Sequence, residues 1–104
     1  MNTKQLALAA HNLLSQPGVW IKGELARSGD GAKVPYRSPE ARHFCLSGAL
    51  SRVCFNFEDY YKLSGEVQRA IYRAKGSFLV DFNDDPKTTL ADVLVVLKKV
   101  AEEA

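Results

Sequence analysis

One apolar stretch, residues 38–55 (SPEARHFCLSGALSRVCF), constrains the fold more than any other part of the sequence. Wound as an α-helix at about 100° per residue, it places apolar side chains over roughly two-thirds of its circumference. Ser38 suits an N-cap, and Pro39 suits the first helical position, where its missing N–H costs nothing. A helix this apolar is normally surrounded by other elements. We therefore expect residues 38–55 to form the central helix of the molecule.

The length and composition are typical of one globular domain. Residues 1–104 are 46% hydrophobic and 25% charged, which is enough for a single core. No apolar run approaches the ~20 residues that a membrane span needs, and the N-terminal stretch reads as a helix ended by Pro17-Gly18, not as a signal peptide. Cys45 and Cys54 lie on opposite faces of the expected central helix, too far apart for a disulfide. These features predict a cytoplasmic protein with reduced thiols.

Amphipathic periodicity predicts further helices on both sides of the central one. The predicted segments and their caps are residues 3–16 (capped by Asn2 or Thr3), a helical turn capped by Asn56, residues 64–75 (ended by Gly76), and residues 89 to about 103 (opened by the capping box Thr89–Asp92). Each segment carries one apolar face, so all of them can contribute to a common core.

Two other segments have strand-like patterns. The turn signal Ser28–Gly31 separates two extended runs, residues 20–27 and 32–36, which predicts a β-hairpin that leans on the helices, with Trp20 packed inward. Residues 78–82 alternate imperfectly and predict a strand or a buried extended link. The sequence thus predicts a mostly α fold: a small single-domain bundle of four or five helices with a short β-hairpin after the first helix.

Positive charge is concentrated in the first half of the chain. Residues 1–55 carry seven Lys and Arg against three Asp and Glu, whereas residues 56–104 carry seven against nine. This imbalance either creates a dipolar binding surface or lets the two halves neutralise each other. The cations of the expected hairpin are Lys22, Arg27, Lys33 and Arg37. We expect them to contact a macromolecular partner, in the first place a protein; a nucleic-acid-binding module is a further alternative, but acidic residues dilute the tyrosine- and arginine-containing region that would serve it.

A small cysteine-dependent hydrolase or transferase is the competing hypothesis. Cys45 would be the nucleophile, His11 its base, reached through the tertiary fold, and Asp84 the group that orients the imidazole. However, no histidine follows Cys45 in the sequence, and a buried free cysteine commonly serves as a small hydrophobic residue. We therefore expect a structural Cys45 and no catalytic residue.

The sequence contains no convincing metal or cofactor motif. Residues 81–92 imitate a calcium-binding loop, but Pro86 stands where the sharp turn needs a glycine, and Asp92 stands where the loop needs a glutamate. Two cysteines and two histidines show no zinc-ligand spacing, and no phosphate-binding glycine loop is present. We expect neither a metal nor another cofactor.

Three motifs, in this order, resemble a known but uncharacterised family. They are W-x-x-G at residues 20–23, A-x-x-F-C-L-x-G-A-L at residues 41–50, and F-N-D-x-P at residues 82–86. They are similar to motifs of short bacterial and phage proteins grouped as a domain of unknown function, in which tryptophan is common where this chain has Phe44 and Phe82. The resemblance spans nearly the whole chain and implies no activity. It implies a phage or prophage origin, and one constellation made of Trp20, Cys45, Gly48, Asn83 and Asp84.

Asn83 and Asp84 also have a purely local explanation, because short polar side chains hydrogen-bond the main chain of a tight turn before a helix. Both interpretations stay open at this point. The predicted binding residues are Trp20, Lys22, Arg27, Lys33, Arg37, Asn83 and Asp84. The functional expectation is a small non-enzymatic binding or regulatory protein, of no specified oligomeric state.

Overall fold

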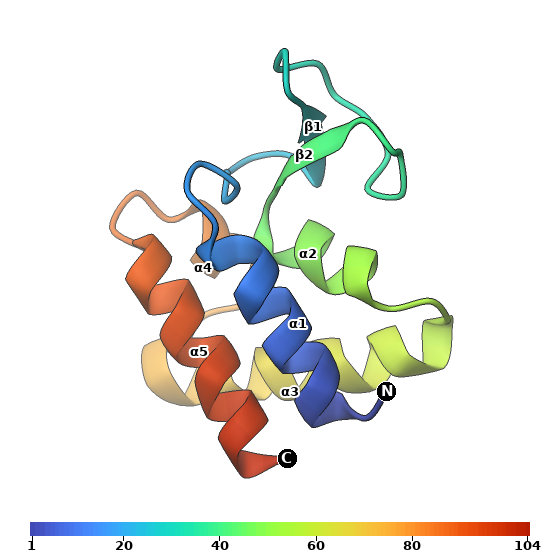
Figure 1. Cartoon of the computed structure of the whole chain (residues 1–104). Helices are drawn as coiled ribbons and strands as arrows, with labels where there is room; N and C mark the ends of the chain where they lie inside the picture. The colour runs from blue at the N-terminus through green and yellow to red at the C-terminus, as the bar shows by residue number, and fades with distance from the viewer.

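In the computed structural model, which describes residues 1–104, five helices form the body and a two-stranded hairpin projects from one end (Figure 1). The elements in chain order are α1 (Thr3–Ser15), β1 (Ala26–Ser28), β2 (Ala41–Phe44), α2 (Leu46–Val53), α3 (Phe57–Lys75), α4 (Leu79–Asp84) and α5 (Leu90–Glu103). The predicted fold class, a mostly helical domain with a hairpin after the first helix, is confirmed.

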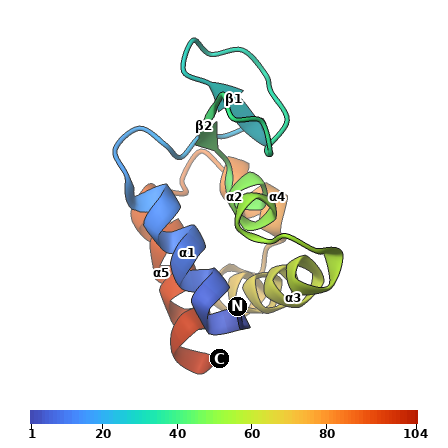
Figure 2. The ribbon, with the colours of Figure 1, turned by 45° about the vertical axis from the view of Figure 1, so that its right-hand side comes forward.

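The first and last helices pack side by side and make the most extensive contact between helices (Figure 1). α3 crosses both of them at the end where the two chain termini lie, and α2 lies over α3 (Figure 2). The fully buried side chains of this layer include Ala10, Leu14, Leu50, Leu63, Val67, Ile71, Val93 and Leu97. A capping box opens α5 at Thr89, as predicted, and Asn2, one of the two predicted caps of α1, belongs to a second capping box. Both boxes satisfy otherwise free N–H groups.

Residues 57–75 form one continuous helix rather than a turn followed by a helix from Ser64. The Asn56 side chain accepts a hydrogen bond from the Asp59 N–H at 2.8 Å and thereby caps the whole of α3. Leu63 is already fully buried, so the apolar stripe begins before Ser64. Gly76 ends the helix in the left-handed region at φ 64°, as the sequence predicts.

The predicted central helix over residues 38–55 is wrong in its first half. Residues 41–44 form β2, and α2 begins only at Leu46. The backbone of Phe44 is engaged by the preceding segment, because its N–H donates to Val19 O at 2.8 Å and its carbonyl accepts from Ile21 N–H at 3.0 Å. Cys45 is extended (φ −79°, ψ 177°) and is the N-cap of α2. Long-range pairing therefore overrides a local pattern that suits a helix.

The predicted hairpin has the right turn, but its first strand covers only Ala26–Ser28 instead of residues 20–27, and its predicted second strand is wrong. The turn closes where Gly31 N–H donates to Ser28 O at 2.9 Å. β1 nevertheless pairs antiparallel with β2, with Ala26 opposite Phe44, and residues 32–36 contribute only an isolated bridge at Lys33. Residues 32–40 thus form a long connection between the turn and β2. This connection is tied to α2, because Arg52 donates to Tyr36 O at 2.8 Å and to Ser38 O at 2.9 Å, whereas the turn itself projects away from the helices (Figure 2).

The predicted strand or extended link at residues 78–82 is a short helix, α4. Leu79, Phe82 and Asn83 are its buried residues, and their spacing of three and four matches a helical turn. A buried asparagine on the apolar face hides this spacing from a hydropathy pattern. No helix of the structure combines the length and the apolar character that crossing a membrane requires.

Candidate functional site

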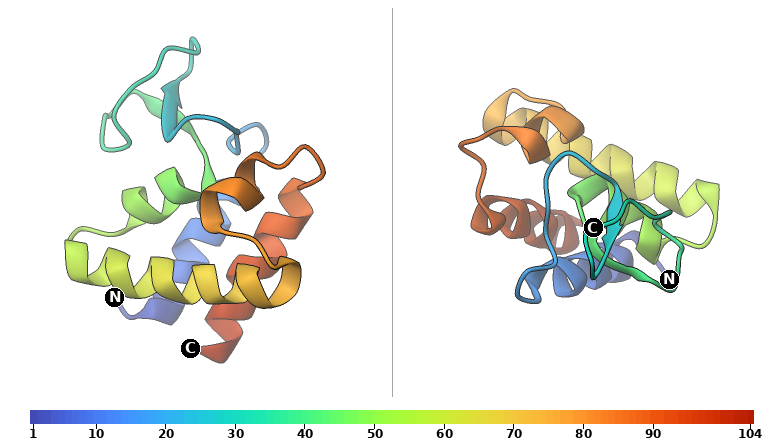
Figure 3. Two further views of the ribbon diagram at one scale, coloured as in Figure 1. Left: turned by 180° about the vertical axis from the view of Figure 1, so that it is seen from behind. Right: turned by 90° about the horizontal axis from the view of Figure 1, so that it is seen from above.

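Asn83, at the end of α4, is the polar centre of the site and is almost fully buried, at 2% exposure. Its Oδ1 accepts hydrogen bonds from Trp20 Nε1 at 2.7 Å and from Leu46 N–H at 2.9 Å. Its Nδ2 donates to Ile21 O at 3.2 Å and to Asp84 Oδ1 at 2.9 Å. One amide therefore joins α4, the start of α2 and the segment that leads to β1, which lie together in the view from behind (Figure 3).

Gly48 lets this leading segment approach the first turn of α2. A Cβ atom at Gly48 would lie 1.9 Å from Leu25 O, closer than any real contact. The Leu25 carbonyl accepts a hydrogen bond from Cys45 N–H at 3.3 Å, and Cys45 Sγ accepts one from Gly48 N–H at 3.3 Å. Glycine is thus required at position 48 by a close backbone approach.

The constellation of Trp20, Cys45, Gly48, Asn83 and Asp84, which the sequence motifs imply, is present as a set of neighbours. Beside it lies a cleft of about 230 Å³. The residues that line this cleft are Gly23, Glu24, Leu25, Cys45, Ser47, Val80, Asn83 and Asp84. Residues 20–25, the start of α2 and α4 therefore enclose one small concave surface.

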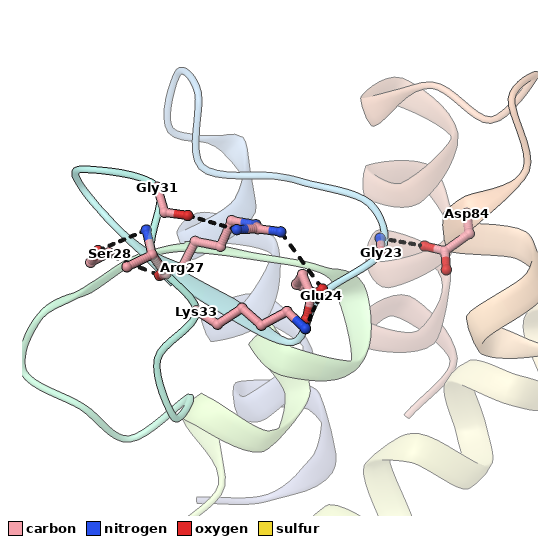
Figure 4. Close-up of polar contacts among 8 residues, drawn as sticks. Gly23, Glu24, Arg27, Ser28, Gly31, Lys33 and Asp84 are labelled. Carbon is pink, nitrogen blue, oxygen red and sulfur yellow. Dashed lines mark hydrogen bonds and ion pairs between the residues drawn. The ribbon is translucent and has the colours of Figure 1, made fainter.

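The open rim of the cleft combines apolar and acidic groups. Leu25 and Val80 are 49% and 59% exposed. Asp84 Oδ1 accepts from Gly23 N–H at 3.0 Å, whereas its second oxygen points away from this bond (Figure 4). Asp81 lies on the same short helix, which contains no Lys or Arg. No sequence pattern marks Leu25 and Val80 as site residues, because a single exposed aliphatic residue carries no signal in a sequence.

The Cys45 thiol faces the cleft in a neutral form. Burial raises its pKa above the ordinary value, and the charge of Asp84 adds to this rise, while hydrogen bonds from the backbone of residues 47 and 48 oppose it. No histidine lines the cleft. His11 lies on α1, and His43 Nδ1 is within 2.7 Å of Gly18 O. The structure brings Cys45 and Asp84 together but supplies no imidazole to activate the thiol.

The cations of the predicted hairpin surface each have a partner within the chain. Lys22 Nζ donates to Asp85 O at 2.6 Å and to Thr88 O at 3.0 Å, and it lies over the Trp20 ring. Arg27 and Lys33 both pair with Glu24, at 3.6 Å and 3.2 Å (Figure 4).

Arg37, the fourth of these cations, lies at the other end of α2. It donates to Ser51 O at 3.3 Å and lies over the exposed ring of Phe55. The four cations therefore stabilise the loops on which they occur. Arg27 and Lys33 do so through Glu24, which lines the cleft, whereas Lys22 and Arg37 bind residues outside the cleft lining.

The two cysteines are free thiols at the two ends of α2, where Cys45 is the N-cap and Cys54 the C-cap. Their predicted placement on opposite faces of one long helix is therefore wrong. No three or more His, Cys, Asp or Glu side chains gather in a geometry that would hold a metal ion.

Comparison with known proteins places the chain among sequences without an assigned activity. A model described as a family of unknown function, DUF6197, matches residues 1–103, which confirms the resemblance that the three motifs indicate. Searches of curated proteins and of solved structures found no match.

Proposed function

The chain belongs to the family of unknown function DUF6197, and from the geometry of its cleft we propose that it is a non-enzymatic binding protein of the cytoplasm that docks a segment of a partner protein, with a regulatory effect on that partner. The cleft between Leu25 and α4 is the contact surface in this proposal. The free thiols of Cys45 and Cys54 support a reducing compartment.

The size of the cleft and the side chains around it favour a protein segment. A volume of about 230 Å³ is smaller than the ~300–1,000 Å³ of typical small-molecule sites, so it suits one inserted side chain. Phe78, two residues before Val80 in the chain, is also exposed, and its ring lies 6.2 Å from that of the exposed Tyr72. Aromatic and aliphatic groups around a concave centre are what protein interfaces bury.

The charge of α4 defines the chemistry of the partner. Asp81 and Asp84 lie on α4 and Asp85 follows it, with no cation on the helix itself. The docked segment therefore carries an apolar side chain next to a lysine or arginine, which pairs with the outward oxygen of Asp84. We locate the contact here, and not on the hairpin cations, because Lys22 and Arg27 already bind carbonyl oxygens within the chain. The same carboxylates repel phosphate, which disfavours nucleic acid.

The cysteine-enzyme alternative gains no support from this geometry. Cys45 is only 7% exposed, burial raises its pKa, and nucleophilic thiols are instead exposed thiolates beside a base. A neutral thiol on a cleft wall serves as an apolar surface for a docked side chain.

Selection from a random peptide library tests the proposal. The wild-type protein should enrich peptides in which an apolar residue adjoins Lys or Arg. Val80→Ser should weaken the enriched peptides about tenfold, equivalent to ~1.4 kcal/mol, because the buried apolar contact is lost. Asp84→Asn, which keeps the acceptor for Gly23 N–H, should remove most of the salt dependence of binding.

Val95→Ser is the matched control, since Val95 is similarly exposed, at 66%, on a different helix. Its affinity for the selected peptides should equal that of the wild type. Enrichment of acidic peptides, or equal binding by the Val80→Ser variant, would overturn the proposal.

A further inference from the structure

A second concave surface lies next to the cleft, beyond Leu25. Its volume is about 360 Å³, and it shares Glu24 and Leu25 with the cleft but no other lining residue. The residues that line the second surface alone are Ala26, Lys33, Val34 and Pro35. Figure 4 shows Glu24 between Lys33 on one side and Gly23 with Asp84 on the other. Glu24 and Leu25 therefore form a ridge between two neighbouring concave surfaces.

Main-chain pairing holds the wall of the second surface in place. Val34 N–H donates to Ala26 O at 3.3 Å, and Lys33 forms an isolated antiparallel bridge with Arg27. The Val34 side chain is partly buried against the core, and Pro35 beside it is exposed. The second surface thus offers an apolar wall in a fixed position next to β1.

The two concave surfaces carry opposite charge. Glu24 pairs with both Arg27 and Lys33, at 3.6 Å and 3.2 Å, so two positive charges face one negative charge. The Lys33 side chain is 70% exposed and can therefore pair with a ligand as well. The cleft instead has Asp84 in its lining, on a helix without Lys or Arg. The combined surface is positive at its hairpin end and negative at α4.

The ridge presents main-chain groups without a partner in the chain. Neither the N–H nor the carbonyl of Glu24 makes a hydrogen bond within the chain, and the Leu25 N–H makes none either. An extended segment that docks on another protein pairs with such groups through its own main chain. Alternate side chains of an extended segment point the same way, roughly 7 Å apart. Two of them can therefore enter the two concave surfaces on either side of the Leu25 side chain.

We propose that the segment docked in the cleft is extended and crosses this ridge, an inference that rests on the proposed function. The order of its residues is Lys or Arg, an apolar residue, any residue, and then Asp or Glu, in either chain direction. The cation pairs with Asp84, the apolar side chain enters the cleft beside Val80, and the acidic side chain pairs with Lys33. The partner segment is thus dipolar, with a fixed order of charges.

Peptide binding to charge-reversed variants tests the crossing. Peptides selected from the random library by the wild-type protein should carry Asp or Glu two positions from the apolar residue, on the side away from Lys or Arg. Lys33→Glu should weaken one such labelled peptide about tenfold in fluorescence anisotropy, because attraction becomes repulsion. Replacing the acidic residue of the peptide with lysine should restore binding to this variant and weaken binding to the wild type.

Lys62→Glu is the matched control. Lys62 is 64% exposed and pairs with Glu58, much as Lys33 pairs with Glu24, but it lines neither concave surface. This variant has the same change in net charge and should bind the peptide like the wild type. Both variants should unfold at the temperature of the wild type, since an exposed ion pair contributes little to stability.

The outcomes separate the crossing from the docking on which it rests. Selected peptides that need Val80 and Asp84 but carry no acidic residue at the stated position would overturn the crossing alone. The same holds for equal binding by Lys33→Glu and the wild type, for an equal loss with Lys62→Glu, and for a lysine peptide that restores nothing. Peptides insensitive to Val80→Ser would overturn the docking in the cleft and the crossing with it.

Discussion

The helical layer and the hairpin region are held in different ways. In the layer, α1, α3 and α5 meet through fully buried aliphatic side chains such as Leu14, Val67 and Leu97. The hairpin region also buries Ala26, Ala41 and Phe44 in the core, but it is attached in addition by hydrogen bonds from side chains to main-chain atoms, for example from Lys22 to Asp85 O. Apolar burial has no preferred direction, whereas hydrogen bonds need donors and acceptors in fixed places. The layer should therefore tolerate changes of residue that the hairpin region does not.

The largest expected effect comes from the close approach at Gly48. Gly48→Ala should lower the free energy of unfolding by about 3 kcal/mol, because the added Cβ overlaps Leu25 O. Urea denaturation measures the change. Gly65→Ala is the matched control in the helical layer and should raise the free energy of unfolding by roughly 0.5–1 kcal/mol, because no neighbouring atom meets the added Cβ. Equal effects at the two glycines would contradict the comparison.

An intermediate effect is expected from isosteric changes, which distinguish the two modes of attachment. Asn83→Asp keeps the shape of the side chain but replaces the Nδ2 donor with an oxygen facing Ile21 O and Asp84. The substitution should lower the free energy of unfolding by about 2–3 kcal/mol, because it leaves a buried acceptor without a donor. Leu97→Met, in the helical layer, should lower the free energy of unfolding by less than ~1.5 kcal/mol. Thermal and urea unfolding measure both, and Trp20 fluorescence reports whether the hairpin detaches first.

The smallest expected effect concerns Lys22. Lys22→Met keeps most of the aliphatic stem but removes the bonds to Asp85 O and Thr88 O, and it should cost about 1 kcal/mol. Amide hydrogen exchange near residues 85–88 should become faster. Lys87→Met, at an exposed neighbouring position, should change neither the free energy of unfolding nor the rate of amide hydrogen exchange. Identical behaviour of the two variants would show that Lys22 does not hold the hairpin.

The helices of the layer could be predicted because their signals are local. Asn2 and Thr89 indicate the N-caps of α1 and α5, and the apolar stripe of α5 repeats every three to four residues. The error at residues 38–55 has a physical cause: a strand of four residues with buried ends runs through Cys45 directly into a helix. The same spacing of apolar residues also fits one face of a helix. Only the pairing with β1 decides whether these residues form a strand or a helix.

The candidate site could be predicted only in part. The order of the motifs grouped Trp20 with Asn83, and the structure joins them at 2.7 Å. The hydrogen bonds of Asn83 and the cleft beside it depend on how α4 meets residues 20–25, which are 54 or more positions earlier in the chain. Leu25 and Val80 acquire their significance from that meeting alone. Local patterns describe single elements and not the surfaces that form between elements.

The pairing of the first helix with the last has a consequence for synthesis of the chain. α1 leaves the ribosome first, with Leu6 and Leu14 needing a partner that α5 supplies in the finished fold. α2 and α3 cover part of the apolar face of α1, and the part that packs on α5 stays uncovered until α5 is made. The core closes only after translation of α5, so the nascent chain passes through a stage in which chaperones that bind exposed apolar helices can recognise it.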